Sequence, residues 1–93
     1  MIVYQSQYYA WIEARGVGSN DRVASSPDSY ISYLNTVSKL IGKDISPSIL
    51  STGQDIERIA QSIEGEKAPK TINNNKSAMR QYVAMVNSEQ FRR

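Results

Sequence analysis

The sequence contains no cysteine and no histidine. Without cysteine the protein has no disulfide and no thiolate nucleophile. Without either residue type it cannot form the usual zinc sites or any catalytic triad that needs an imidazole. We therefore expect no metal site, no cofactor and no enzymatic activity.

Long apolar runs are also missing. No stretch approaches the roughly 18 apolar residues that are needed to span a bilayer. The opening residues Met1-Ile2-Val3-Tyr4 lack the charged flank of a signal peptide. We expect a soluble, cytoplasmic protein that does not contact a membrane.

The chain has 93 residues, which allows one small domain over residues 1–93 and excludes a doubly wound sheet or a barrel with its own active-site cleft. Forty per cent of the residues are apolar and 22% are charged. These values are ordinary for a globular protein, so the chain is expected to fold.

Positive charge is concentrated towards the C-terminus. The formal net charge is only +2, which by itself does not indicate a polyanionic partner. Residues 1–65 carry five basic and seven acidic side chains, whereas residues 66–93 carry six basic and two acidic ones. The basic side chains of the second part are Lys67, Lys70, Lys76, Arg80, Arg92 and Arg93. They predict a local basic surface, although cations also suit the last turn of any helix.

The first two predicted helices span residues of about 4–15 and 27–41, where apolar residues recur with helical spacing. The first stripe consists of Tyr4, Tyr8, Trp11 and Ile12. The second stripe consists of Tyr30, Leu34, Val37 and Ile41, widened by Ile31 and Leu40. Ser26-Pro27-Asp28 is a strong helix start, and Gly16 and Gly42 are natural helix ends. Small and turn-forming residues at 16–25 predict a loop.

The third and fourth predicted helices span residues of about 53–64 and 72–88. The third follows Thr52-Gly53-Gln54-Asp55, which resembles a capping box with Asp in place of Glu. Its apolar stripe consists of Ile56, Ile59, Ala60 and Ile63, and Gly65 closes it. The fourth is expected to start at Thr71 as N-cap after a charged linker, with a stripe formed by Ile72, Met79, Tyr82, Val83 and Val86. Asn75 interrupts that stripe.

A short apolar turn at 47–50 is expected between the second and third helices, after Ser46-Pro47. No convincing strand alternation and no internal repeat are present. The sequence therefore predicts an all-α fold, a compact bundle of four main helices with one extra short helical turn.

The polar side of the last predicted helix is the most informative surface pattern. It carries amide, ammonium, hydroxyl and guanidinium groups on Asn73, Asn74, Lys76, Ser77 and Arg80. In a major groove, Asn pairs with adenine, Arg pairs with guanine and Lys contacts phosphates. An ordinary solvated helix face explains the same residues.

Other patterns have simpler explanations. Aromatic side chains can stack on unpaired bases, but Tyr8 and Trp11 lie on the buried stripe, so packing is predicted for them and exposure for Tyr9. The acidic pairs Asp55/Glu57 and Glu64/Glu66 are rejected as catalytic pairs, because residues two apart on a helix point to different faces. The segment Gly16-Val17-Gly18 has neither the preceding strand nor the following Gly-Lys-Ser/Thr of a phosphate-binding loop.

The order of elements and one longer run carry a family resemblance. The run is Lys70-Thr71-Ile72-Asn73-Asn74-Asn75-Lys76-Ser77-Ala78-Met79-Arg80-Gln81-Tyr82-Val83, preceded by the turn Asp44-Ile45-Ser46-Pro47 and the acidic start Gln54-Asp55-Ile56. Together with the aromatic first helix and a second helix that ends in Leu-Ile-Gly, these residues resemble the SAM-like core-binding domain of phage integrases and other tyrosine recombinases. Similar helical modules precede restriction-type nuclease domains. The resemblance covers about residues 4–88.

This resemblance implies an orthogonal four-helix bundle that grips one side of duplex DNA, with the last helix and the loop before it near the backbone and major groove. The residues it matches best are Lys70, Thr71, Asn74, Ser77 and Arg80. Together with the basic and polar residues above, the predicted nucleic-acid-binding residues are Lys67, Lys70, Thr71, Asn73, Asn74, Lys76, Ser77 and Arg80. Asn75 departs from the family pattern, which has an aromatic or aliphatic residue there.

A recombinase also needs a catalytic domain with Arg, His and a nucleophilic Tyr, which a chain of this length without histidine does not contain. We therefore expect a non-enzymatic DNA-binding module that positions a partner protein or a separate catalytic domain, either as part of a longer protein or as a small protein of a mobile element. The alternative is a protein-interaction module of a phage or plasmid factor that acts on a host protein, through the aromatic first helix or an apolar groove. The sequence leaves the oligomeric state open.

Overall fold

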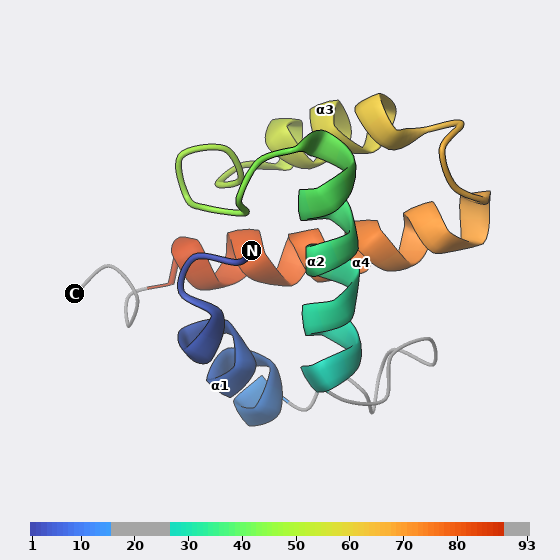
Figure 1. The fold of residues 1–93 in the computed structure, drawn as a ribbon. Helices are drawn as coiled ribbons and strands as arrows, with labels where there is room; N and C mark the ends of the chain where they lie inside the picture. Colours follow the sequence, from blue (N-terminus) through green and yellow to red (C-terminus); the bar gives the residue numbers. More distant parts are fainter. Residues whose placement is uncertain (16–26, 89–93) are drawn as a thin grey trace.

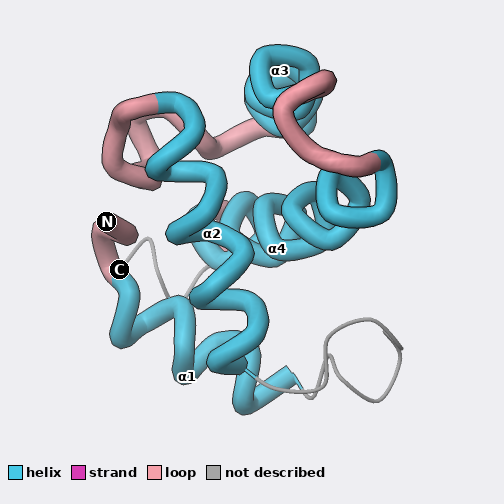
Figure 2. Tube along the Cα trace, turned by 45° about the vertical axis from the view of Figure 1, so that its right-hand side comes forward, coloured by secondary structure: helices cyan, strands magenta, loops and turns pink. Residues whose placement is uncertain are grey.

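The computed structural model describes residues 1–15 and 27–88, which form four helices (Figure 1). They are α1 (Gln5–Arg15), α2 (Pro27–Ile41), α3 (Gly53–Ile63) and α4 (Pro69–Val86). In these two ranges no β-strand is present, and only two isolated bridges occur, between Ile2 and Ile45 and between Glu64 and Lys67. The predicted all-α fold is confirmed for this part of the chain (Figure 2).

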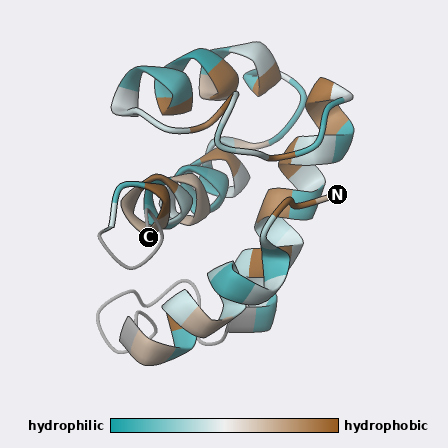
Figure 3. Ribbon diagram, turned by 90° about the vertical axis from the view of Figure 1, so that its left-hand side faces the viewer, coloured by the Kyte–Doolittle hydropathy of each residue, from teal (hydrophilic) through white to brown (hydrophobic). Residues whose placement is uncertain are grey.

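The helices pack around α4, which contacts each of the other three. α2 crosses α4, and α1 and α3 lie on opposite sides of α4 (Figure 1). Both apolar and polar residues occur along each helix (Figure 3), and buried apolar residues from all four helices form one core. None of the helices described here is long and apolar enough to cross a membrane.

The centre of the core is aromatic. Tyr8, Tyr30 and Tyr82 are almost completely buried, and the rings of Tyr8 and Tyr82 lie 5.6 Å apart between centroids. The Tyr8 hydroxyl donates to the Ala78 carbonyl at 2.8 Å, and the Tyr82 hydroxyl donates to the Val3 carbonyl at 2.7 Å. Burial raises the pKa of both Tyr8 and Tyr82 well above its ordinary value. The predicted packing role of Tyr8 is confirmed.

The start of the chain differs from the prediction. Tyr4 precedes α1 with a φ of 64° and is exposed, so its place on the buried stripe was wrong. The physical reason is pairing with a distant turn, because the Val3 N–H donates to the Ile45 carbonyl at 2.8 Å and keeps the first residues out of the helix. Tyr8 and Ile12 are buried, Trp11 is partly buried and Tyr9 is exposed, as predicted.

The two middle helices follow their local sequence patterns. α2 has the predicted bounds, and Gly42 follows it with a φ of 70°, a left-handed conformation that glycine adopts without strain. The turn after Ser46 buries Leu50, whose N–H donates to the Ser46 carbonyl at 2.9 Å. All four residues of the predicted α3 stripe are buried.

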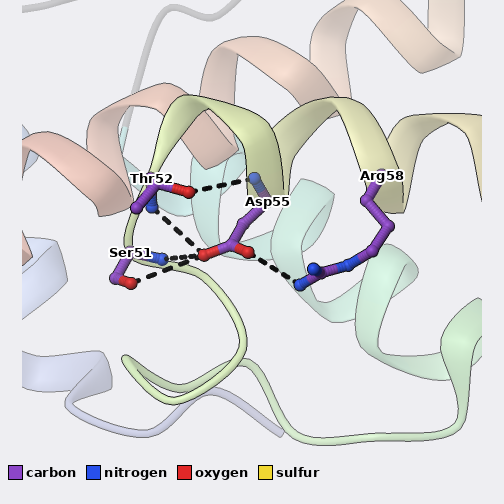
Figure 4. A network of polar contacts seen from close by, with 4 residues as sticks. All are labelled: Ser51, Thr52, Asp55 and Arg58. Carbon is purple, nitrogen blue, oxygen red and sulfur yellow. Dashed lines mark hydrogen bonds and ion pairs between the residues drawn. The ribbon is translucent and has the colours of Figure 1, made fainter.

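The predicted capping box at the start of α3 is confirmed (Figure 4). The Asp55 N–H donates to Thr52 Oγ1 at 3.2 Å, and Asp55 Oδ2 accepts from the backbone N–H groups of Ser51 at 2.9 Å and Thr52 at 3.2 Å. Arg58 pairs with Asp55 Oδ1 at 2.7 Å. These donors, the Ser51 N–H first, hold the pKa of the Asp55 carboxyl below its usual range. Asp55 therefore has a structural role at the start of α3.

The bounds of α4 correct the sequence prediction. The helix begins at Pro69 instead of residue 72 and ends at Val86 instead of residue 88. Ala68 is the N-cap and Pro69 the first helical residue, so the expected N-cap role of Thr71 was wrong. The physical reason is that proline fits the first turn without losing a hydrogen bond, and the Ile72 N–H already donates to the Ala68 carbonyl at 3.0 Å. The predicted loop at 16–25 and the basic residues Arg92 and Arg93 lie outside the described residues.

Candidate nucleic-acid interface

The eight predicted contact residues lie in the segment after α3 and on the first part of α4. Gly65, with a φ of 94°, turns the chain, and the Glu66 N–H donates back to the Ile63 carbonyl at 3.0 Å. Pro69 then starts α4, which runs back along α3 in the opposite direction (Figure 1). The turn thus brings Lys67 and the start of α4 to the same end of the molecule.

One row of predicted residues faces away from the core. Lys70, Asn73, Ser77 and Arg80 are spaced by three, four and three positions, which puts them on one helix face. Lys70, Asn73 and Arg80 are exposed and Ser77 is partly exposed. The Arg80 guanidinium donates to Ser77 Oγ at 2.9 Å. We call these four residues the outer row of α4.

The remaining predicted residues are arranged differently. Lys67 is exposed and precedes the helix, and Thr71 and Asn74 are partly buried. Lys76 is also partly buried, and its ammonium lies 3.2 Å from Glu57 Oε2 on α3. The structure therefore brings four of the eight residues into one exposed row and leaves the other four outside it.

Asn75 faces the interior. Its side chain is 0% exposed, and neither Oδ1 nor Nδ2 has a hydrogen-bond partner. The neighbouring buried positions of α4 are Ala78, Met79, Tyr82 and Met85. Asn75 thus occupies a core position of the helix, and its amide is not available to a nucleic acid.

The outer row and Lys67 carry positive charge that has no ion-pair partner among the described residues. Within the described ranges, no carboxylate lies within 4.0 Å of the charged nitrogens of Lys67, Lys70 or Arg80. α4 also has no acidic residue in its first turn. These cations can therefore meet an anionic ligand without first breaking an ion pair to residues 1–15 or 27–88.

Acidic residues border this surface on the side of α3. A groove of about 580 Å³ between α3 and α4 is lined by Glu57 and Glu64 as well as by Lys67, Asn73 and Lys76. The two signs of charge face each other across it. Glu57 is the residue that sequence analysis missed here, since its partner Lys76 is 19 positions away and no local pattern indicates the contact.

The described residues contain no group of acidic, histidine or cysteine side chains that could hold a metal ion.

The chain matches no protein-family model, no curated protein and no solved structure.

Proposed function

We propose that this chain is a non-enzymatic module that binds duplex DNA through the outer row of α4 and Lys67, and so positions a partner protein or a separate catalytic domain on the DNA. The observation that supports this proposal is the exposed row of Lys70, Asn73, Ser77 and Arg80. The resemblance of residues 70–83 to the core-binding domain of tyrosine recombinases points to the same surface.

The dimensions of the row suit a major groove. Lys70 and Arg80 are ten positions apart, which corresponds to about 15 Å along a helix axis. The major groove of B-DNA is wide enough to admit an α-helix. Lys70 and Arg80 then contact phosphates, while Asn73 carries the amide group that pairs with adenine.

The charge state of the row also favours binding. Lys67, Lys70 and Arg80 have no acidic partner among the described residues, so contact with phosphates breaks no ion pair within that part of the chain. Release of counterions from DNA is the main source of affinity for such contacts, and it makes binding weaker as salt increases.

The first prediction concerns these cations. We expect the double variant Lys70→Gln/Arg80→Gln to bind duplex DNA more weakly and with a flatter salt dependence, since each lost phosphate contact removes about 0.9 from the slope of log K against log salt. Fluorescence anisotropy with a labelled duplex at several salt concentrations measures both quantities.

The matched control is Lys39→Gln/Lys43→Gln, which removes two exposed positive charges that do not lie on α4. It should change the slope much less. Equal losses in the two double variants would show that binding follows net charge alone and would contradict the proposed site. Failure of the unchanged protein to bind at low salt would reject the function itself.

A protein-interaction module is the second candidate, and the observation that favours it is the exposed aromatic surface near α1. Tyr4 and Tyr9 are 44% and 37% exposed, whereas the other described tyrosines are buried or partly buried. Such residues are enriched in protein interfaces. Light scattering after size exclusion tests this candidate. A stable dimer of this chain that is weakened by Tyr9→Ser would favour protein contacts over DNA.

A further inference from the structure

Lys76 differs from the other cations of this region. Its ammonium lies 3.2 Å from Oε2 and 3.4 Å from Oε1 of Glu57, so it contacts both carboxylate oxygens. The Lys76 side chain is only 27% exposed, whereas that of Glu57 is 61% exposed. The pair connects α3 to α4, and both of its residues line the groove between these helices.

The pair lies directly beside the outer row of α4. Lys76 follows Asn73 by three positions and precedes Arg80 by four, and both spacings make side chains neighbours on a helix surface. Asn73 also lines the groove that contains Glu57 and Lys76. A phosphate held by the outer row would thus lie close to both Lys76 and the Glu57 carboxylate. Lys76 could bind this phosphate only after leaving Glu57.

We propose that Glu57 regulates the DNA site by competing with the phosphate backbone for Lys76. In the free protein the carboxylate neutralises the ammonium, and on binding Lys76 exchanges this carboxylate for a phosphate oxygen. This inference rests on the proposed function. The exchange costs little free energy, because ion pairs near the surface contribute little to stability and are weakened by salt. Glu57 thereby keeps the affinity for DNA below the value that the cations alone would give.

The test is Glu57→Gln, which keeps the shape of the side chain and removes its charge. We expect DNA affinity to rise roughly three- to tenfold. This gain should shrink as salt increases, because salt also weakens the ion pair that opposes binding in the unchanged protein. Glu13→Gln is the charge-matched control, since Glu13 is an exposed carboxylate on α1.

A double-mutant cycle with Lys76→Gln separates competition from simple repulsion. If Glu57 acts by holding Lys76, the gain from Glu57→Gln falls to that of Glu13→Gln once Lys76 is replaced. The ¹⁵N resonance of the Lys76 ammonium should move when Glu57 is replaced by Gln. It should also move when a DNA duplex is added to the unchanged protein. Circular dichroism verifies that each variant keeps its helices.

The outcomes separate the two proposals. If the unchanged protein binds DNA but Glu57→Gln behaves like Glu13→Gln, the competition is rejected and the DNA site stands. A gain that is equally large in the Lys76→Gln background also rejects it, since Glu57 then acts only by repelling DNA. If no variant binds at low salt, the DNA site is rejected and the competition with it.

Discussion

Asn75 places an amide in the interior of the α4 packing face. Both polar atoms of its side chain lack a hydrogen-bond partner, and burying an amide in this way costs about 1–3 kcal/mol. Leucine has the same number of side-chain heavy atoms with the same branching, and none of them is polar. We expect Asn75→Leu to raise the free energy of unfolding by about 1–2 kcal/mol, measured by urea denaturation.

Asn87 provides the comparison for this prediction. Its Nδ2 donates to the carbonyls of Ser51 and Val83, each at 2.8 Å, so Asn87→Leu removes hydrogen bonds that are made. That variant should lower the free energy of unfolding. A decrease for Asn75→Leu would mean that its amide is satisfied in solution and would overturn the assignment of an unpaired group.

Individual residues differ in how far the sequence predicts their environment. Tyr8 was predicted correctly because several apolar neighbours share its helical stripe. Asn75 could not be assigned, since an amide on an apolar stripe is equally compatible with a rotated helix. Tyr4 was misplaced because the preceding residue, Val3, pairs through its backbone with Ile45. This pairing, between residues far apart in the sequence, keeps Tyr4 out of α1.

Among the helices, α3 has the best-defined start, and this start depends on one ionised group. The Asp55 carboxylate accepts backbone hydrogen bonds from Ser51 and Thr52. We expect Asp55→Asn to lower the free energy of unfolding at pH 7 by about 1 kcal/mol. Glu13→Gln, an exposed carboxyl outside the cap, should have almost no effect at that pH.

Asp55→Asn should also change how the free energy of unfolding depends on pH. The pKa of Asp55 is lowered in the folded protein, so its contribution is present above the unfolded pKa of about 3.9 and is lost as the pH falls through the folded pKa. The difference in free energy of unfolding between the unchanged protein and Asp55→Asn should therefore shrink in acid. Urea denaturation at pH 7 and in acid measures this difference. A constant difference would contradict the role of the charge.

The boundaries of helices were predictable where a local chemical signal marks them. Pro27 and Gly42 delimit α2, and the Thr52/Asp55 box starts α3. The start of α4 was placed too late because its N-cap, Ala68, makes no side-chain capping bond and so leaves no recognisable pattern. Thr71 looked like a better cap only because its hydroxyl has the right chemistry.

The arrangement of the whole molecule depends on contacts between distant residues. Trp11 donates to Gln81 Oε1 at 3.2 Å across 70 positions, and Lys76 pairs with Glu57 on another helix. The spacing of polar residues on α4 predicted which side chains belong to its polar side. It could not predict that Lys76 is already neutralised, since this follows from the packing of α3 against α4.

The central claim is that the outer row of α4 meets duplex DNA. The most direct measurement is a titration of the ¹⁵N-labelled protein with an unlabelled duplex at low salt, followed by amide chemical shifts. The claim predicts that the largest changes lie between Lys67 and Arg80, that they disappear at high salt, and that the N-terminal helix is unaffected. Unchanged spectra at low salt, or changes centred on Tyr9 and its neighbours, would contradict it.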